Sequence, residues 1–89
     1  MNEEAKGLVL LVACHMGVPY DDLMTGCKRP PVVRARDIAA LMVRRKFGMK
    51  YFDLAALFNM NMANVRLATY RAVRSKSAQR AIDEIKVKL

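Results

Sequence analysis

The sequence predicts an all-α protein, a compact bundle of about five helices. Apolar residues recur at helical spacing along most of the chain, and no stretch alternates strictly between apolar and polar residues as a half-buried strand does. Residues that cap or stop helices separate the apolar segments. With 89 residues, 54% of them hydrophobic, the chain is expected to form a single domain over residues 1–89 with a modest core.

The first helix is expected over about Glu3–Met16, with Asn2 as a candidate N-cap. Gly17 and Pro19 then end it. One stripe of this helix is formed by Leu8, Leu11, Val12 and His15. Cys14 lies in the same apolar run and is expected to be a small buried residue.

A short helical turn is expected from Asp21 through Met24, followed by the loop Gly26–Pro31. The two prolines at the end of this loop lack backbone N–H groups and stiffen it. Lys28 and Arg29 therefore carry their charges at a restricted position, directly before the next helix.

That next helix is expected over about Val32–Phe47 and is ended by Gly48. Its broad apolar face consists of Val33, Ala35, Ile38, Ala39, Leu41, Met42 and Val43. The basic residues near its C-terminus complement the helix dipole, which is a sufficient structural reason for their presence.

Two helices, Tyr51–Phe58 and Met62–Lys76, are expected around the turn Asn59–Asn61. A last helix, with Ser77 as its N-cap, would close the bundle through Ala78, Ile82, Ile85 and Leu89.

The segment Tyr51–Arg74 has the spacing of a helix-turn-helix. Ala55 supplies the small residue where the second helix crosses the first, Asn59 tolerates positive φ in the turn, and Val65 anchors the second helix. Further inward positions are filled by Leu54, Phe58, Met60 and Ala68. A plain helical hairpin with the same spacing is the alternative.

Positive charge is concentrated on the middle of the chain. The net charge is −3 over residues 1–27, +11 over residues 28–80 and zero over residues 81–89, which gives +8 in total. Charge focused on the segment with the motif favours a polyanionic partner. A basic surface that only promotes solubility is the alternative.

Catalysis and metal binding have little support, and we expect no enzyme, no metal and no cofactor. His15 is the one histidine and shares an apolar stripe, while its neighbour Cys14 points to a different helix face. Cys14, His15 and Cys27 would need an unidentified fourth ligand to hold zinc. The apolar run Leu8–Met16 is too short to span a bilayer, so we expect a cytoplasmic protein with no membrane partner.

The most specific pattern in the chain is a fixed order of residue types. A basic residue is followed, after three positions of any type, by two aliphatic residues, a basic residue, a small residue and an arginine. One position of any type then precedes an isoleucine and an alanine. The pattern is formed by Lys28, Val32, Val33, Arg34, Ala35, Arg36, Asp37, Ile38 and Ala39. Further matching positions are Val12-Ala13, Asp22-Leu23, Asp53-Leu54, Phe58, Val65 and Ala68. In this order the chain resembles domain IV, the C-terminal DNA-binding domain of the DnaA replication initiator, a Trp-repressor-like helix-turn-helix fold.

The resemblance implies binding to double-stranded DNA, with helix 62–76 in the major groove and the basic loop 28–31 at the minor groove or backbone. The expected base contacts, from the hydrogen-bonding and apolar groups of their side chains, are Asn61, Met62, Ala63, Asn64 and Arg66. The expected backbone or minor-groove contacts are Lys28, Arg29, Arg34, Arg36, Lys50, Arg71 and Arg74.

Each assignment has a structural alternative. Asn61 is also a candidate helix cap, Met62 a candidate core residue, and the basic loop a solvated turn. Either Arg34 or Arg36 has a candidate ion-pair partner in Asp37 or Asp53.

The chain departs from the family in its recognition element. Between its Phe and Val the family reads Gly-Gly-Arg-Asp-His-Thr-Thr, whereas this chain reads Asn-Met-Asn-Met-Ala-Asn over residues 59–64. We therefore do not expect the family's own target sequence, and the ATPase domain of an initiator is missing. The resemblance implies a small phage or bacterial regulator of transcription or replication.

A protein-interaction adapter of the replication machinery is the rival hypothesis, with a replication or transcription protein as its partner. Exposure of both Met60 and Met62 would favour the adapter, and burial of both would favour DNA binding. The sequence leaves the choice between a monomer and a homodimer open.

Overall fold

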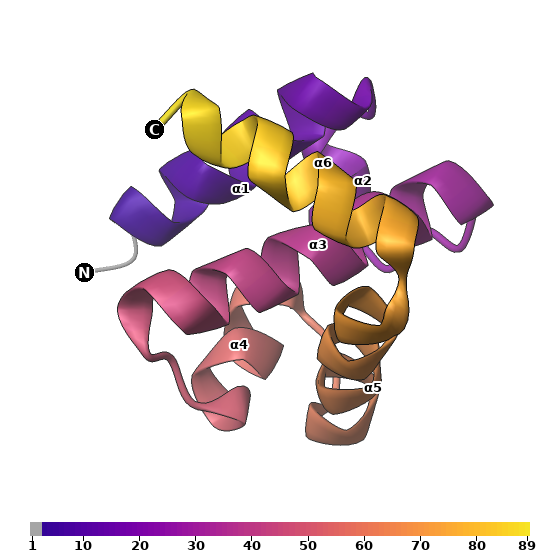
Figure 1. The fold of residues 1–89 in the computed structure, drawn as a ribbon. Coiled ribbons are helices and arrows are strands. Elements are labelled where there is room, and N and C mark those ends of the chain that lie inside the picture. The colour runs from indigo at the N-terminus through magenta and orange to yellow at the C-terminus, as the bar shows by residue number, and fades with distance from the viewer. Residues whose placement is uncertain (1–2) are drawn as a thin grey trace.

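The computed structural model describes residues 3–89, which form six helices and no strand (Figure 1). They are α1 (Glu3–Met16), α2 (Tyr20–Met24), α3 (Pro30–Phe47), α4 (Tyr51–Phe58), α5 (Met62–Arg74) and α6 (Lys76–Val87). The predicted all-α bundle is confirmed. The helix beyond the five expected is α2, which the sequence indicated only as a helical turn.

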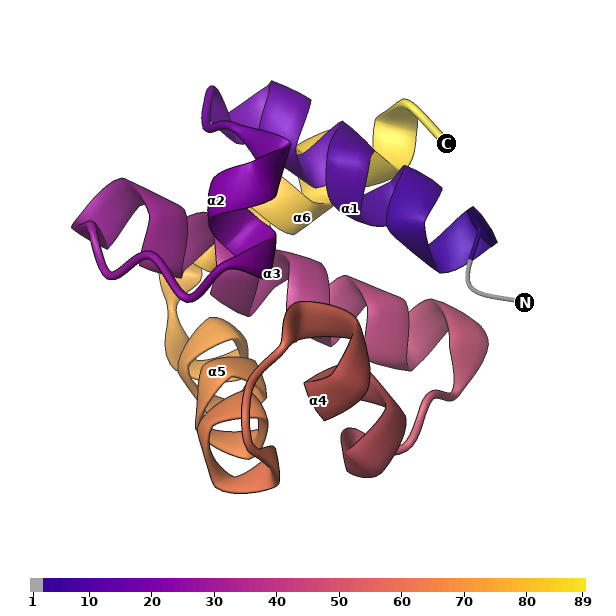
Figure 2. The ribbon, with the colours of Figure 1, turned by 180° about the vertical axis from the view of Figure 1, so that it is seen from behind.

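Helix α3 lies at the centre and contacts each of the other five helices. Figures 1 and 2 show α1 and α6 on one side of it and α4 and α5 on the other. Nine consecutive residues, 35–43, are buried, so α3 is enclosed on all sides instead of showing one apolar stripe to a core.

Helix α3 begins at Pro30, two residues earlier than predicted. Prolines are tolerated in the first helical turn, where their missing N–H groups would have no intrahelical partner. Its end is as predicted: Gly48 has φ 62° and ψ 28°, the left-handed conformation that stops a helix.

Helix α1 has the predicted bounds, while the candidate cap Asn2 lies outside the described residues. The prediction that Cys14 is buried is wrong, because its side chain is exposed. The buried face of α1 is formed by Ala5, Leu8, Val9, Val12 and Ala13. At about 100° per residue, Cys14 falls on the opposite side of the helix from this face.

The boundary between α5 and α6 lies at Ser75, not at Ser77 as predicted. Ser75 has extended backbone angles, and its Oγ accepts a hydrogen bond of 3.1 Å from the N–H of Ala78. Ala78, Ile82 and Ile85 are buried as expected, but the helix ends at Val87 and the side chain of Leu89 is 61% exposed.

The turn between α4 and α5 is built as predicted. Asn59 has φ 55° and ψ 48° and is the one non-glycine residue with positive φ among residues 3–89. Asn61 caps α5, since its Oδ1 accepts a hydrogen bond of 2.8 Å from the N–H of Asn64. The inward residues Leu54, Ala55, Phe58, Val65 and Ala68 are all buried.

The conformation of Asn59 leads to a stability prediction. Replacement by Ala should lower the free energy of unfolding by about 1–2 kcal/mol, because alanine enters the left-handed region at that cost. Replacement by Gly should change it by less than about 0.5 kcal/mol, because glycine enters the region freely. Urea unfolding followed by circular dichroism measures both. Equal losses for Ala and Gly would show that the Asn59 side chain, not its backbone, stabilises the turn.

Candidate nucleic-acid interface

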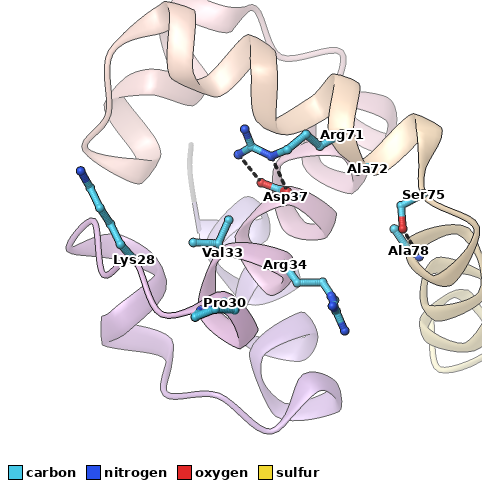
Figure 3. Close-up of a pocket in the computed structure, with 9 residues that line it drawn as sticks. All are labelled: Lys28, Pro30, Val33, Arg34, Asp37, Arg71, Ala72, Ser75 and Ala78. Carbon is cyan, nitrogen blue, oxygen red and sulfur yellow. Dashed lines mark hydrogen bonds and ion pairs between the residues drawn. The ribbon is translucent and has the colours of Figure 1, made fainter.

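A groove runs between the start of α3 and one flank of α5, and the basic loop borders it. One hollow of about 470 Å³ is lined by Lys28, Pro30, Val33, Arg34, Asp37, Arg71, Ala72, Ser75 and Ala78 (Figure 3). A second hollow, of about 480 Å³, shares Lys28, Val33 and Arg71 and extends to the α4–α5 turn and Asn64. The groove thus joins two segments that the sequence analysis treated as separate DNA contacts.

Arg71 and Asp37 form an ion pair inside this groove (Figure 3). Arg71 Nε donates to Asp37 Oδ2 and Arg71 Nη2 donates to Asp37 Oδ1, each at 2.9 Å. These hydrogen bonds raise the pKa of Arg71 above its ordinary value. The Asp37 side chain is only 11% exposed, whereas that of Arg71 is 52% exposed. Arg71 therefore reaches the surface, but the carboxylate of Asp37 neutralises its charge. This pairing was not among the predictions from the sequence.

Arg36 is not a surface residue, and its prediction as a DNA backbone contact is wrong. Its guanidinium lies inside the protein, where Nε donates to the carbonyl of Leu23 and Nη2 to the carbonyl of Asp22, both at 2.8 Å. Burial lowers the pKa of Arg36 from its ordinary value. Arg36 thereby satisfies carbonyls near the end of α2 that lack intrahelical partners and holds α2 on α3.

The basic loop keeps two charges at the surface. Arg29 is exposed and pairs with Asp22 at 2.8 Å through Nη2 and Oδ2. Lys28 is exposed and takes part in no ion pair among residues 3–89. Hydrogen bonds from the backbone N–H and side chain of Arg29 lower the pKa of the neighbouring Cys27 thiol.

Arg34 and Lys50 are also exposed and outside the ion pairs of the described residues. Figure 3 shows Lys28 and Arg34 at opposite edges of the hollow. Lys50 directly precedes α4, which packs against α5.

The predicted base contacts all lie at the exposed N-terminal part of α5. Asn61, Met62, Ala63, Asn64 and Arg66 are exposed. The Oδ1 of Asn61 is occupied by the helix cap, which was the structural alternative. The guanidinium of Arg66 lies 5.4 Å from the ring centroid of Tyr51, within the range of a cation–π contact.

The methionines at the turn divide between the two rival hypotheses. Met60 is half-buried and packs against the core, whereas Met62 is 44% exposed. Neither burial of both nor exposure of both is observed. Three further apolar residues on the same helix are exposed and were not predicted as contacts: Leu67, Tyr70 and Val73. Helical periodicity relative to buried Val65 and Ala68 would have placed them outward.

The one histidine has its side-chain partners on the far side of α3, away from the groove. His15 Nε2 lies 3.0 Å from Glu84 Oε1, and its Nδ1 lies 3.0 Å from Lys88 Nζ, so His15 ties α1 to α6. Within residues 3–89, His, Cys, Asp and Glu form no group of three or more that could hold a metal ion. No helix of this part of the chain combines the length and apolar character needed to cross a membrane.

Comparisons with known proteins yield no family model, curated sequence or solved structure that matches this chain. The resemblance to the DnaA domain rests on the residues quoted for it.

The Asp37–Arg71 pair leads to a second stability prediction. Asp37→Asn should lower the free energy of unfolding by about 1–2 kcal/mol, since a hydrogen-bonded charge pair is lost while water already screens the exposed half of Arg71. Asp53→Asn is the matched control, because Asp53 is exposed and forms no ion pair among the described residues. It should change stability by less than about 0.5 kcal/mol. Equal effects in urea unfolding would contradict a stabilising role for the pair.

Proposed function

We propose that this protein binds double-stranded DNA, with α4 and α5 acting as a helix-turn-helix. Helix α5 enters the major groove, and the loop 28–31 lies along the backbone or the neighbouring minor groove. The observation that carries the proposal is that exposed cations around α5 take part in no ion pair within residues 3–89, five of them being Lys28, Arg34, Lys50, Arg66 and Arg74.

These five cations come from the loop, the start of α3, the residue before α4, and α5 itself. Lys28 and Arg34 border the groove on one flank of α5, whereas Lys50 lies beside Tyr51, which Arg66 contacts on the other flank. A major-groove helix has a phosphate backbone on each side, so cations on both flanks suit it better than a basic patch on one flank.

In biological terms, the proposal is a small phage or bacterial regulator of transcription or replication that acts in the cytoplasm on the nucleoid. This role follows from the resemblance. A homodimer would place two copies of α5 on two half-sites, as small regulators often do.

One observation favours the adapter as a second candidate. Leu67, Tyr70 and Val73 expose apolar surface along α5, which a protein partner could cover. An adapter would have no need of five free cations around the same helix. Absence of DNA binding by the folded protein would therefore favour a replication or transcription protein as partner, to be sought by a pull-down that compares the wild type with Leu67→Ala.

The first test is a fluorescence anisotropy titration into a labelled random-sequence duplex. We expect micromolar or tighter binding at 50 mM salt. If the five free cations each neutralise one phosphate, affinity should fall on the order of several hundredfold at 200 mM salt. No binding at 50 mM salt by protein with a helical spectrum would overturn the proposal.

A pair of arginine variants locates the surface. Arg74→Ala should weaken binding on all duplexes and lower the salt slope by about 1, because Arg74 is an exposed cation on α5. Arg45→Ala removes the same charge from the C-terminal end of α3, next to α1 and α6, and should leave the slope nearly unchanged. Arg71→Ala is a poorer probe, because it also leaves Asp37 with no partner. Equal slopes for the Arg74 and Arg45 variants would place the DNA elsewhere.

The rate at which Cys27 is alkylated can show whether bound DNA covers the neighbouring basic loop. In protein carrying Cys14→Ser, the lowered thiol pKa should make Cys27 react with iodoacetamide at pH 7 faster than an ordinary cysteine. Saturating duplex should slow this reaction severalfold by covering the loop. Unchanged alkylation of DNA-bound protein would show that the loop 28–31 lies away from the DNA.

A further inference from the structure

The N-terminal half of the outward face of α5, the part that would read bases, is apolar. Its buried side is formed by Val65, Ala68, Thr69 and Ala72. At 100° per residue, the direction opposite to these residues is occupied by Ala63, Leu67, Tyr70 and Arg74, whereas Met62 and Val73 lie on the flank that also carries Arg66. Leu67 is 51% exposed, and no element within residues 3–89 covers it.

The three polar side chains near the start of α5 are directed away from the centre of this face or are partly used within the protein. Asn61 uses its Oδ1 to cap α5. Arg66 lies against Tyr51, and Asn64 points to the flank that faces the groove. Paired hydrogen bonds to purines, the usual form of direct readout, therefore have few free groups to make them.

The major groove offers one apolar group at its base edges, the C5-methyl group of thymine, and 5-methylcytosine presents a methyl group at the same position. We propose that α5 recognises duplexes by their C5-methyl groups, with Leu67 as the principal contact and Ala63, one turn before it, beside it. The free cations Arg66 and Arg74 lie on the same helix, so the apolar surface suits a polyanion better than an uncharged partner. The inference rests on the proposed DNA binding and names its substrate class, A·T-rich or methylated duplex.

The test uses two pairs of duplexes of equal length and charge. In one pair, an A·T-rich duplex contains either thymine or deoxyuracil, and in the other, a G·C-rich duplex contains either cytosine or 5-methylcytosine. Each pair differs only in methyl groups. We expect tighter binding to the methylated member of both pairs, by roughly fourfold for each methyl group that α5 buries. The salt slope should be the same for all four duplexes, because the phosphates are unchanged.

Two leucine variants separate a local effect from a general one. Leu67→Ala should reduce the preference for thymine over deoxyuracil to less than half of its wild-type ratio while binding to the deoxyuracil duplex changes little. Leu10→Ala is the matched control, because Leu10 is 50% exposed but lies on α1, across α3 from α5. It should keep the full preference.

The outcomes also separate this inference from the proposed function. Equal affinity for the methylated and unmethylated members of both pairs, with steep salt dependence retained, would overturn methyl recognition and leave DNA binding standing. A preference that Leu67→Ala leaves intact would also overturn the inference, because α5 would then not be its source. Failure to bind any of the four duplexes at 50 mM salt would overturn both proposals.

Discussion

The burial of α3 on all sides is the constraint on which the rest of the structure depends. A helix enclosed over residues 35–43 has no solvent side to which polar groups can turn, yet Arg36 and Asp37 lie within that stretch. Each must find a partner on a neighbouring helix, because an unpaired buried charge is costly. Arg36 finds the backbone carbonyls near the end of α2, and Asp37 finds Arg71 on α5. Within residues 3–89, no buried side-chain nitrogen or oxygen is left without a hydrogen-bond partner.

These two buried contacts also determine which parts of the surface lie together. Arg36 holds α2 against α3, and the basic loop that leaves α2 is then brought to the start of α3. Asp37, one residue further along α3, holds the flank of α5 across the same groove. Small side chains on α3, among them Ala35 and Ala39, let the surrounding helices approach closely. The candidate interface is thus a consequence of how α3 is packed, even though α3 itself contributes only Arg34 to the five free cations named around α5.

Helix α5 combines two kinds of surface that point to different partners. Cations lie on or beside the flanks of α5, and a polyanion would neutralise them. Apolar side chains lie on its outward face, and a partner that excludes water would bury them. The major groove of DNA provides both, phosphates at its edges and methyl groups on its floor. A protein partner would account for the apolar face but not for the cations. Of the two methionines at the turn, Met60 packs against the core, whereas Met62 is exposed on the flank of α5 that also carries Arg66.

The sequence by itself determined most of the helices and several of their ends, because these depend on local signals: glycine after α3, asparagine in the left-handed turn at residue 59, and the Asn61 cap. Where two residues offered the same signal, as Ser75 and Ser77 did, only the packing of α6 decided between them. The tertiary structure alone decided which charged side chains are buried or paired and which remain free at the surface. Asp37 and Arg71 are 34 positions apart, and nothing in their local patterns distinguishes an arginine that will be buried, like Arg36, from one that stays free, like Arg34. Helical periodicity determines on which face of a helix a side chain lies. Whether its charge is paired within the protein depends on a distant element, which either supplies a partner or leaves the charge in water, where it can contact a ligand.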